Sequence, residues 1–170
     1  MRIILTGATG FVGGEVLKQA LEDSSITGIM TLTRRPLGVT HPKLEDVILQ
    51  DFLDYSRIKA SLKADACIWC LGVSQTAVSR EEYIKITFDY AVMAARAMFS
   101  ENPHMRFCFL SGSRADQEEK SRVLYGRIKG RTERELGGLS PNVYHFRPAF
   151  IRHTSRTFTA HPISRRISIC

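Results

Sequence analysis

Three glycines near the start of the chain limit what it can fold into. Gly7, Gly10 and Gly13 follow the apolar run 2–6 and open the segment 11–21, which has the apolar spacing of a helix. Such glycines allow a tight turn between a strand and a helix, close approach of a ligand to the backbone, and close packing of the helix on a sheet. A triad in this position is far more specific than the same triad elsewhere. The segment therefore predicts a β-strand, a glycine turn and an α-helix.

The rest of the chain continues this alternation of apolar runs and helical stripes. Continuous apolar strands that alternate with helices are typical of a parallel sheet with helices on both faces. We therefore expect a doubly wound, mostly parallel, Rossmann-like α/β sheet of about six strands. The domain covers 1–150, and an irregular basic tail covers 151–170. The predicted strands are 2–6, 28–33, 46–50, 65–71, 105–111 and 142–146, and the predicted helices are 11–21, 80–100 and 121–136, with a short helix capped by Asp54 or Ser56.

The glycine turn also predicts a dinucleotide site. A pyrophosphate would lie at the N-terminus of the helix 11–21, where free N–H groups and the helix dipole favour an anion. The second predicted strand ends in Arg34 and Arg35, where an acid would favour NAD. Guanidinium groups bind a 2′-phosphate well, so we expect NADP(H) rather than NAD(H), although two solvated arginines are the alternative. We expect Asp51 and Phe52 to lie beside the adenine, and Leu71, Gly72 and Val73 to run along the cofactor backbone. The other predicted cofactor-binding residues are Gly7, Thr9, Gly10, Phe11, Val12, Gly13, Arg34 and Arg35.

Tyr125 and Lys129 lie four residues apart in the predicted helix 121–136, so one helix face carries both. A phenol is a poor acid at neutral pH unless a nearby cation stabilises its anion, which Lys129 could do. The same spacing is common in helices with no catalytic role. On spacing alone, the pair is open between catalysis and a solvated or packing face.

Taken together, these segments resemble the short-chain dehydrogenase/reductase superfamily. The resemblance covers 1–150 and rests on TGATGFVGG, LTRRP, QDF, LSGSRAD and YGRIKG. The glycine spacing is similar to that of the extended and atypical branches. LSGSRAD followed by LYGRIKGRTERELGGL most resembles the atypical, NmrA-like oxidoreductases related to the human Tat-interacting protein.

The resemblance implies a Ser–Tyr–Lys site. Tyr125 would exchange a proton with the substrate oxygen, and Lys129 would lower the pKa of Tyr125 and bind the nicotinamide ribose. A serine would hold the substrate oxygen, with Ser113 favoured and Ser111 second. Pro148 matches an Arg-Pro pair that lies near the nicotinamide in the family.

Two functions follow from this resemblance. The first is an NADP(H)-dependent oxidoreductase acting on a carbonyl or an alcohol, or an epimerase or isomerase with the same machinery. The second is a non-catalytic NADPH-sensing regulator. Relatives continue well past the Arg-Pro pair with elements that close the substrate pocket, and we expect this lid to be missing here, which favours the sensor. The Tyr–Lys pair favours the enzyme.

Charge and cysteine content exclude other classes. The net charge is +7, but four arginines and no acid lie in 151–170, which leaves +3 for the rest. No basic helix with interleaved aromatics occurs, so a nucleic-acid partner is not expected. Cys67 and Cys70 lie three apart on a predicted strand and point to opposite faces, which predicts core residues of a reducing compartment and no metal site. With no apolar run of membrane length, we expect a cytoplasmic protein. The expected partners are a small-molecule substrate and a second copy or another protein. The apolar helix 80–100 is open between a dimer face and burial against the sheet.

Overall fold

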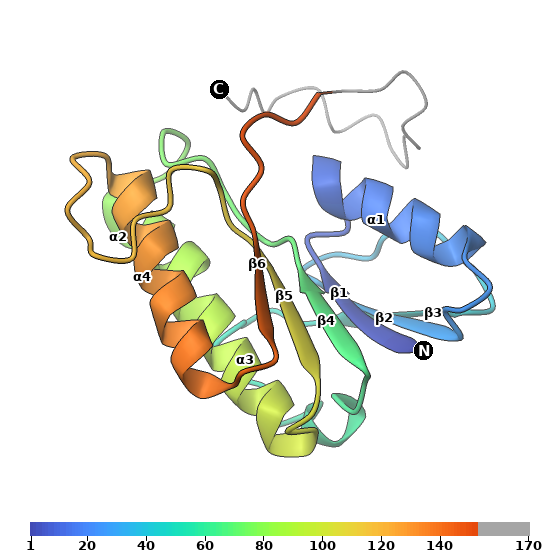
Figure 1. The fold of residues 1–170 in the computed structure, drawn as a ribbon. Coiled ribbons are helices and arrows are strands. Elements are labelled where there is room, and N and C mark those ends of the chain that lie inside the picture. The colour runs from blue at the N-terminus through green and yellow to red at the C-terminus, as the bar shows by residue number, and fades with distance from the viewer. Residues whose placement is uncertain (153–170) are drawn as a thin grey trace.

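The computed structural model describes residues 1–152, which form a single six-stranded parallel sheet (Figure 1). Its strand order is β3-β2-β1-β4-β5-β6, and every neighbouring pair is parallel. The predicted Rossmann-like α/β fold is therefore confirmed. The strands are β1 (Arg2–Thr6), β2 (Gly28–Thr33), β3 (Leu44–Ile48), β4 (Ala66–Trp69), β5 (Arg106–Leu110) and β6 (Val143–Phe146).

Helices connect these strands and lie on both faces of the sheet (Figure 1). α1 lies on one face, and α2, α3 and α4 lie on the other. The helices are α1 (Phe11–Glu22), α2 (Arg80–Ile84), α3 (Tyr90–Glu101) and α4 (Leu124–Leu139), with a 3-10 turn η1 (Lys59–Ser61) and a π-helical turn η2 (Lys85–Asp89). The predicted helix 80–100 is thus α2, η2 and α3 in direct succession.

Several boundaries differ from the sequence predictions. α4 is Leu124–Leu139 rather than 121–136, and β4 ends at Trp69 rather than at 71. The third strand is Leu44–Ile48 rather than 46–50. The short helix expected from Asp54 or Ser56 is replaced by η1 further along the chain. The reason is local: the carboxylate of Asp54 accepts a hydrogen bond from the N–H of Ser56 at 2.9 Å, which closes a turn instead of starting a helix.

The strand order places the ligand crevice of this fold. The chain builds outward from β1 to β3 and then crosses to β4 on the other side of β1. In open parallel sheets, ligands bind outside the carboxyl ends of the strands at this reversal. The turn after β1 and the segment after β4 are therefore the expected floor of the site.

The two faces of the sheet are covered unequally. Aromatic side chains fill the face under α3 and α4, including Phe52, Trp69, Phe107 and Phe109. The core under α1 is smaller and aliphatic. On that side, Tyr144 and Phe146 of the edge strand β6 remain 47% and 57% exposed within residues 1–152.

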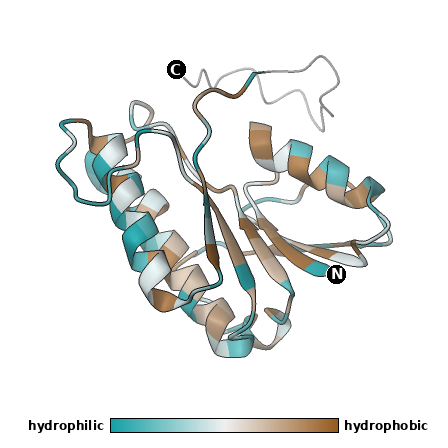
Figure 2. Cartoon of the chain, viewed as in Figure 1, coloured by the Kyte–Doolittle hydropathy of each residue, from teal (hydrophilic) through white to brown (hydrophobic). Residues whose placement is uncertain are grey.

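Hydropathy follows the same layers. The strands are mostly brown or pale in Figure 2, whereas teal is concentrated on α4 and in the loop that precedes it. Within the described residues, no helix is both long and apolar enough to cross a membrane.

Candidate functional site

The turn between β1 and α1 depends on close packing of backbone on backbone. Gly7 has a φ of +68°, which L side chains rarely adopt. A Cβ on Gly7 would lie 2.6 Å from the carbonyl oxygen of Cys70, at the end of β4. A Cβ on Gly13 would overlap the carbonyl group of Gly7. Both glycines are therefore required by close packing between the turn, the helix and β4.

Gly10 has a different environment from the other two. It is exposed and caps α1 without a side-chain hydrogen bond, and its N–H donates to the carbonyl of Gly7 at 2.8 Å. Thr9 beside it is also exposed, whereas Phe11 and Val12 are half-buried in the first turn. The first turn of α1 contains no acidic residue. A helix N-terminus that is open, uncapped and free of acid fits a pyrophosphate.

Arg34 and Arg35 lie exposed directly after β2. The loop that carries them is fixed at both ends by Asp46 of β3. Its carboxylate accepts hydrogen bonds from the hydroxyls of Thr31 at 2.8 Å and Thr33 at 3.0 Å, and from the N–H of Leu37 at 2.8 Å. The two guanidinium groups are thus carried on an anchored turn.

The segments after β3 and β4 offer the candidate cofactor site their backbone and the carboxylate of Asp51. Asp51 is exposed, but the ring of Phe52 is buried against Trp69 and Tyr90. Phe52 can therefore offer an adenine only its backbone. After β4, the N–H of Leu71 donates to the hydroxyl of Thr6 at 3.2 Å.

Gly72 and Val73 continue from Leu71 along the edge where the strands end. Gly72 is exposed, and a Cβ there would meet nothing within 4 Å. Val73 is half-buried. The space beside Gly72 is therefore free of other protein atoms. A segment that runs beside a cofactor needs such space.

Tyr125 lies over the segment that follows β5. Its phenol oxygen sits where a Cβ on Gly112 would be, so the lack of a side chain at Gly112 makes room for the ring. The N–H of Tyr125 donates to the side-chain oxygen of Gln75 at 2.9 Å, which ties the start of α4 to the loop after β4. Burial raises the pKa of the Tyr125 phenol, and the negative charge of Glu133 raises it further.

Lys129 is buried one turn further along α4, with 8% of its surface exposed. Its Nζ donates to the carbonyl of Leu110 at 2.7 Å and lies 4.6 Å from the centre of the Phe109 ring. Burial lowers the pKa of the ammonium to about 8, against the opposing charge of Glu133. Tyr125 and Lys129 therefore both pack on the end of β5, as the helical spacing predicts.

The two candidate serines have different environments. Ser111 is buried, and its hydroxyl faces the carboxylate of Glu133 without a hydrogen bond of normal geometry. Ser113 is exposed, and its N–H donates to the carbonyl of Pro148 at 3.1 Å. A substrate can reach Ser113, whereas Ser111 belongs to the interior.

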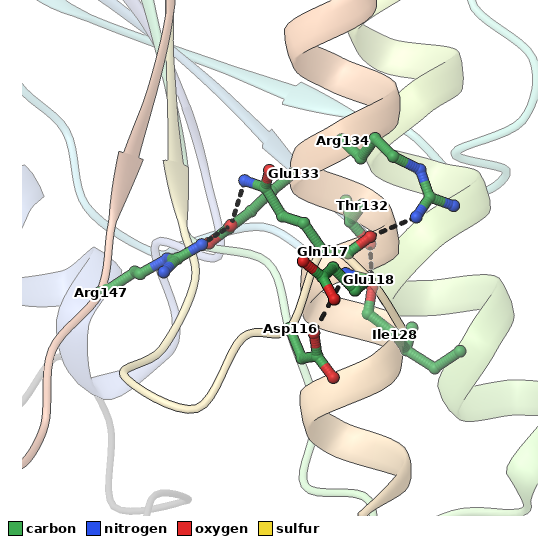
Figure 3. Close-up of polar contacts among 8 residues, drawn as sticks. All are labelled: Asp116, Gln117, Glu118, Ile128, Thr132, Glu133, Arg134 and Arg147. Atoms are coloured by element: carbon green, nitrogen blue, oxygen red, sulfur yellow. Dashed lines mark hydrogen bonds and ion pairs between the residues drawn. The ribbon is translucent and has the colours of Figure 1, made fainter. Parts of the chain in front are cut away.

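A polar network from neighbouring segments surrounds the buried carboxylate of Glu133 (Figure 3). Arg147 binds its carboxylate through two guanidinium nitrogens, with Nε at 2.8 Å. Gln117, from the loop before α4, donates to the same carboxylate at 2.9 Å. Burial raises the pKa of Glu133, but these donors and the charge of Arg147 lower it more, so the carboxyl group is ionised at neutral pH.

Sequence reasoning missed Gln75, Gly112 and Glu133. Glu133 had a signal: it extends the Tyr125–Lys129 spacing by one more turn along the same face. Gly112 and Gln75 had none, because their roles depend on contacts between segments far apart in the chain. Among residues 1–152, no group of three His, Cys, Asp or Glu side chains could hold a metal ion, and Cys67, Cys70 and Cys108 are free.

Comparison with known families gives a match over most of this region. Residues 3–126 match the model of the NAD dependent epimerase/dehydratase family. The "Leucinostatins biosynthesis cluster protein T" of Purpureocillium lilacinum is 37% identical over 141 residues, which cover 80% of this chain and 51% of that protein. "Protein FMP52, mitochondrial" of Meyerozyma guilliermondii is 30% identical over 154 residues, covering 89% and 65%. The chain thus spans about half to two thirds of the length of these relatives.

Solved structures show the same fold at low identity. The Bordetella bronchiseptica enzyme WbmH, in complex with NAD+, superposes with a TM-score of 0.71 at 16% identity over 87% of this chain and 55% of its own. UDP-glucose 4-epimerase of Thermotoga maritima, with UDP-glucose, gives a TM-score of 0.68 at 17% identity over 86% and 55%.

Proposed function

Because this chain belongs to the NAD-dependent epimerase/dehydratase family, within the short-chain dehydrogenase/reductase superfamily, we propose that it is an NADP(H)-binding oxidoreductase or epimerase. Its substrate is a small molecule with a carbonyl or an alcohol group. The reacting groups are Tyr125, Lys129 and Ser113, and Ser111 is the second candidate for the serine. The nucleotide-binding part of this proposal follows from the family, and the remainder from the geometry of the site.

One observation carries the proposal: the glycine turn and the Tyr–Lys pair meet the same edge of the sheet. Gly7 touches the end of β4 at Cys70, and Gln75 in the next loop accepts the N–H of Tyr125. Lys129 binds the carbonyl at the end of β5, the neighbour of β4. A cofactor held at the turn would therefore extend toward the phenol and the ammonium, since both lie where the crevice of such sheets opens.

The roles follow from the chemistry of each group. When bound, the nicotinamide supplies a hydride acceptor or donor. The hydroxyl of Ser113 hydrogen-bonds the substrate oxygen, and the phenol of Tyr125 exchanges a proton with it. In oxidation of an alcohol, the substrate oxygen would lose its proton to the Tyr125 phenolate, while the bound nicotinamide would supply the hydride acceptor. Lys129 stabilises negative charge on the phenol oxygen and donates to the ribose hydroxyls.

The preference for NADP(H) rests on Arg34 and Arg35. Both are exposed on a turn that Asp46 anchors, so little backbone entropy is lost when they bind a 2′-phosphate. The double variant Arg34→Ala/Arg35→Ala should weaken NADPH binding by at least about tenfold and leave NADH binding unchanged. Equal losses for both cofactors would remove the arginines from the specificity site.

The test of the catalytic assignment is Tyr125→Phe. We expect turnover of any substrate found by screening to fall by at least about a hundredfold, because the proton donor is gone, while NADPH affinity changes less than about threefold. Tyr144→Phe is the matched control, since its phenol is exposed on β6 away from the crevice. Unchanged turnover in Tyr125→Phe would remove this residue from the mechanism.

A second function is favoured by the raised pKa of Tyr125. Because burial raises the pKa of Tyr125, its phenol is a weaker acid and less of its anion is available at neutral pH. The ammonium of Lys129 is also engaged by the carbonyl of Leu110. A protein of this kind could bind NADPH and signal its presence to a partner without turnover. Substrate screening of the NADPH-bound protein separates the two, because the sensor shows affinity without any Tyr125-dependent reaction.

A further inference from the structure

Glu133 is the feature that the proposed chemistry does not use. It is fully buried, with 0% of its surface exposed, in the middle of the helix that carries Tyr125 and Lys129. An ionised carboxylate is costly to bury unless its oxygens are hydrogen-bonded. Here Arg147 and Gln117 satisfy both oxygens. A solvent-exposed carboxylate or an apolar side chain at this position would not need these hydrogen bonds. The network is therefore specific to a buried, ionised Glu133.

The network fixes two segments against α4. Arg147 follows β6 directly and lies between Phe146 and Pro148. The carbonyl of Phe146 accepts the N–H of Ser111 at 2.8 Å, and the carbonyl of Pro148 accepts the N–H of Ser113 at 3.1 Å. The arginine that Glu133 binds is therefore part of the backbone pairing that positions both serines.

Glu133 also lies one helical turn from Lys129 on the buried face. The groups around Lys129 are the thiol of Cys70 after β4, and the ring of Phe109 with the carbonyl of Leu110 on β5. Burial raises the pKa of the Cys70 thiol to about 11, so this group is neutral at pH 7. Glu133 is the ionised acid among these neighbours.

The groups that face Glu133 itself come from three elements. Arg147 and His145 belong to β6 and the residue after it, Gln117 to the loop before α4, and Ser111 to the end of β5. Burial lowers the pKa of His145, so its ring is neutral at pH 7. Arg147 is thus the positive charge opposite Glu133, and Lys129 is the second cation within its field.

We propose that Glu133 is a positioning residue of the site: through Arg147 and Gln117 it holds the serine segment and Pro148 against α4, and its charge keeps Lys129 an ammonium. The proposal rests on the proposed function only in the task of Lys129. Its structural part, the charge coupling inside α4, belongs to the protein without any ligand.

The direct test is the titration of Lys129 in Glu133→Gln. The ε-carbon of Lys129 is followed by NMR in protein labelled with 13C-lysine and assigned with Lys129→Arg. We expect the wild-type midpoint near pH 8 and a midpoint lower by about one unit in Glu133→Gln, because the nearest negative charge is lost. A folded Glu133→Gln protein with the wild-type midpoint would overturn the proposal and reduce Glu133 to a packing role.

Glu135→Gln is the matched control. It removes the same charge from the same helix, but from an exposed ion pair with Arg96, and should leave the midpoint unchanged. A shift as large as in Glu133→Gln would show a general charge effect and contradict the proposal.

Arg147→Gln covers the case in which Glu133→Gln does not fold. The Arg147 side chain is 42% exposed, but Glu133 loses two of its three donors in this variant, so circular dichroism first checks that the protein is folded. Removing this cation leaves Glu133 to act on Lys129 and should move the midpoint upward. A fixed or lowered midpoint would contradict the proposal.

NADPH titration of the same variants separates this proposal from the proposed function. If wild-type protein binds no NADPH while the Lys129 midpoint still responds to Glu133, the proposed function fails and the charge coupling stands. If NADPH binds but the midpoint does not respond, only the coupling fails.

Discussion

The two ends of the crevice differ in what forms them: backbone at the β1–α1 turn and side chains at α4. At the β1–α1 turn, main chain packs on main chain, and Gly7 and Gly13 leave no room for a side chain. At α4, the site is made of buried side chains, with Lys129 and Glu133 drawn into the interior. The first end is specified by steric exclusion, which stabilises the fold. The second holds charges that cost stability, which is typical of functional sites.

The largest effect should come from filling the turn. Gly13→Ala should lower the free energy of unfolding by at least about 3 kcal/mol, because its Cβ overlaps the backbone of Gly7 and neither group can move without displacing α1 or β1. Urea denaturation followed by circular dichroism measures the change.

Gly14→Ala is the control in the same helix turn. Its Cβ would make an ordinary 3.4 Å contact with the carbonyl of Ala8, and alanine favours the helix by about 1 kcal/mol. We expect unchanged or higher stability. If the two variants behaved alike, the steric account of this end would be wrong.

An intermediate effect of opposite sign is expected at the other end. Lys129→Met should raise the free energy of unfolding at pH 7 by about 2 kcal/mol, because the lowered pKa of Lys129 measures what its buried charge costs the fold. That cost is full below pH 8, where the ammonium is charged in both states. It declines as pH rises from about 8, the folded pKa, toward 10.5, the unfolded value. The advantage of Lys129→Met should therefore vanish across this range.

Urea denaturation of both proteins at pH 7 and pH 10 measures the difference. A variant that is less stable than the wild type at pH 7 would show that Lys129 stabilises the fold. It would contradict the claim that the charges at α4 cost stability.

The smallest effect should appear where the serine segment meets α4. Gly112→Ala places a Cβ on the phenol oxygen of Tyr125, but this end of the ring can swing away, so the cost should be about 1 kcal/mol. The same substitution in a Tyr125→Ala background should cost nothing. A double-mutant cycle of urea denaturation measures this coupling, and additive effects would show that the ring does not lie on Gly112.

The sequence predicts the backbone end better than the side-chain end. Glycine spacing reports a steric requirement inside one short segment, so TGATGFVGG sufficed to predict the strand, the turn and the helix. Tyr125 and Lys129 were predicted from helical spacing and resemblance. Arg147 and Gln117 contact Glu133 from other segments, and a local sequence pattern cannot predict such contacts. Phe52 shows the opposite case: its position after β3 suggested a ligand, but the ring fills the core beside Trp69.

The predicted short helix after β3 is wrong, because local signals there were ambiguous. Asp54 and Ser56 are residues that start helices and also close turns, and the sequence could not choose between these uses. The turn prevailed because the chain enters the core at Tyr55, which is 4% exposed. Tertiary burial decided an ambiguity that local propensity left open.

The central claim is that both ends of the crevice serve one NADP(H) site, and calorimetric titration of the purified chain with NADPH and then NADH tests it most directly. We expect saturable binding of NADPH and at least about tenfold weaker binding of NADH, since Arg34 and Arg35 favour the 2′-phosphate. Loss of the NADPH signal in Gly10→Val, which crowds the pyrophosphate position, would place binding at the glycine turn. Absence of binding for both cofactors would contradict the account.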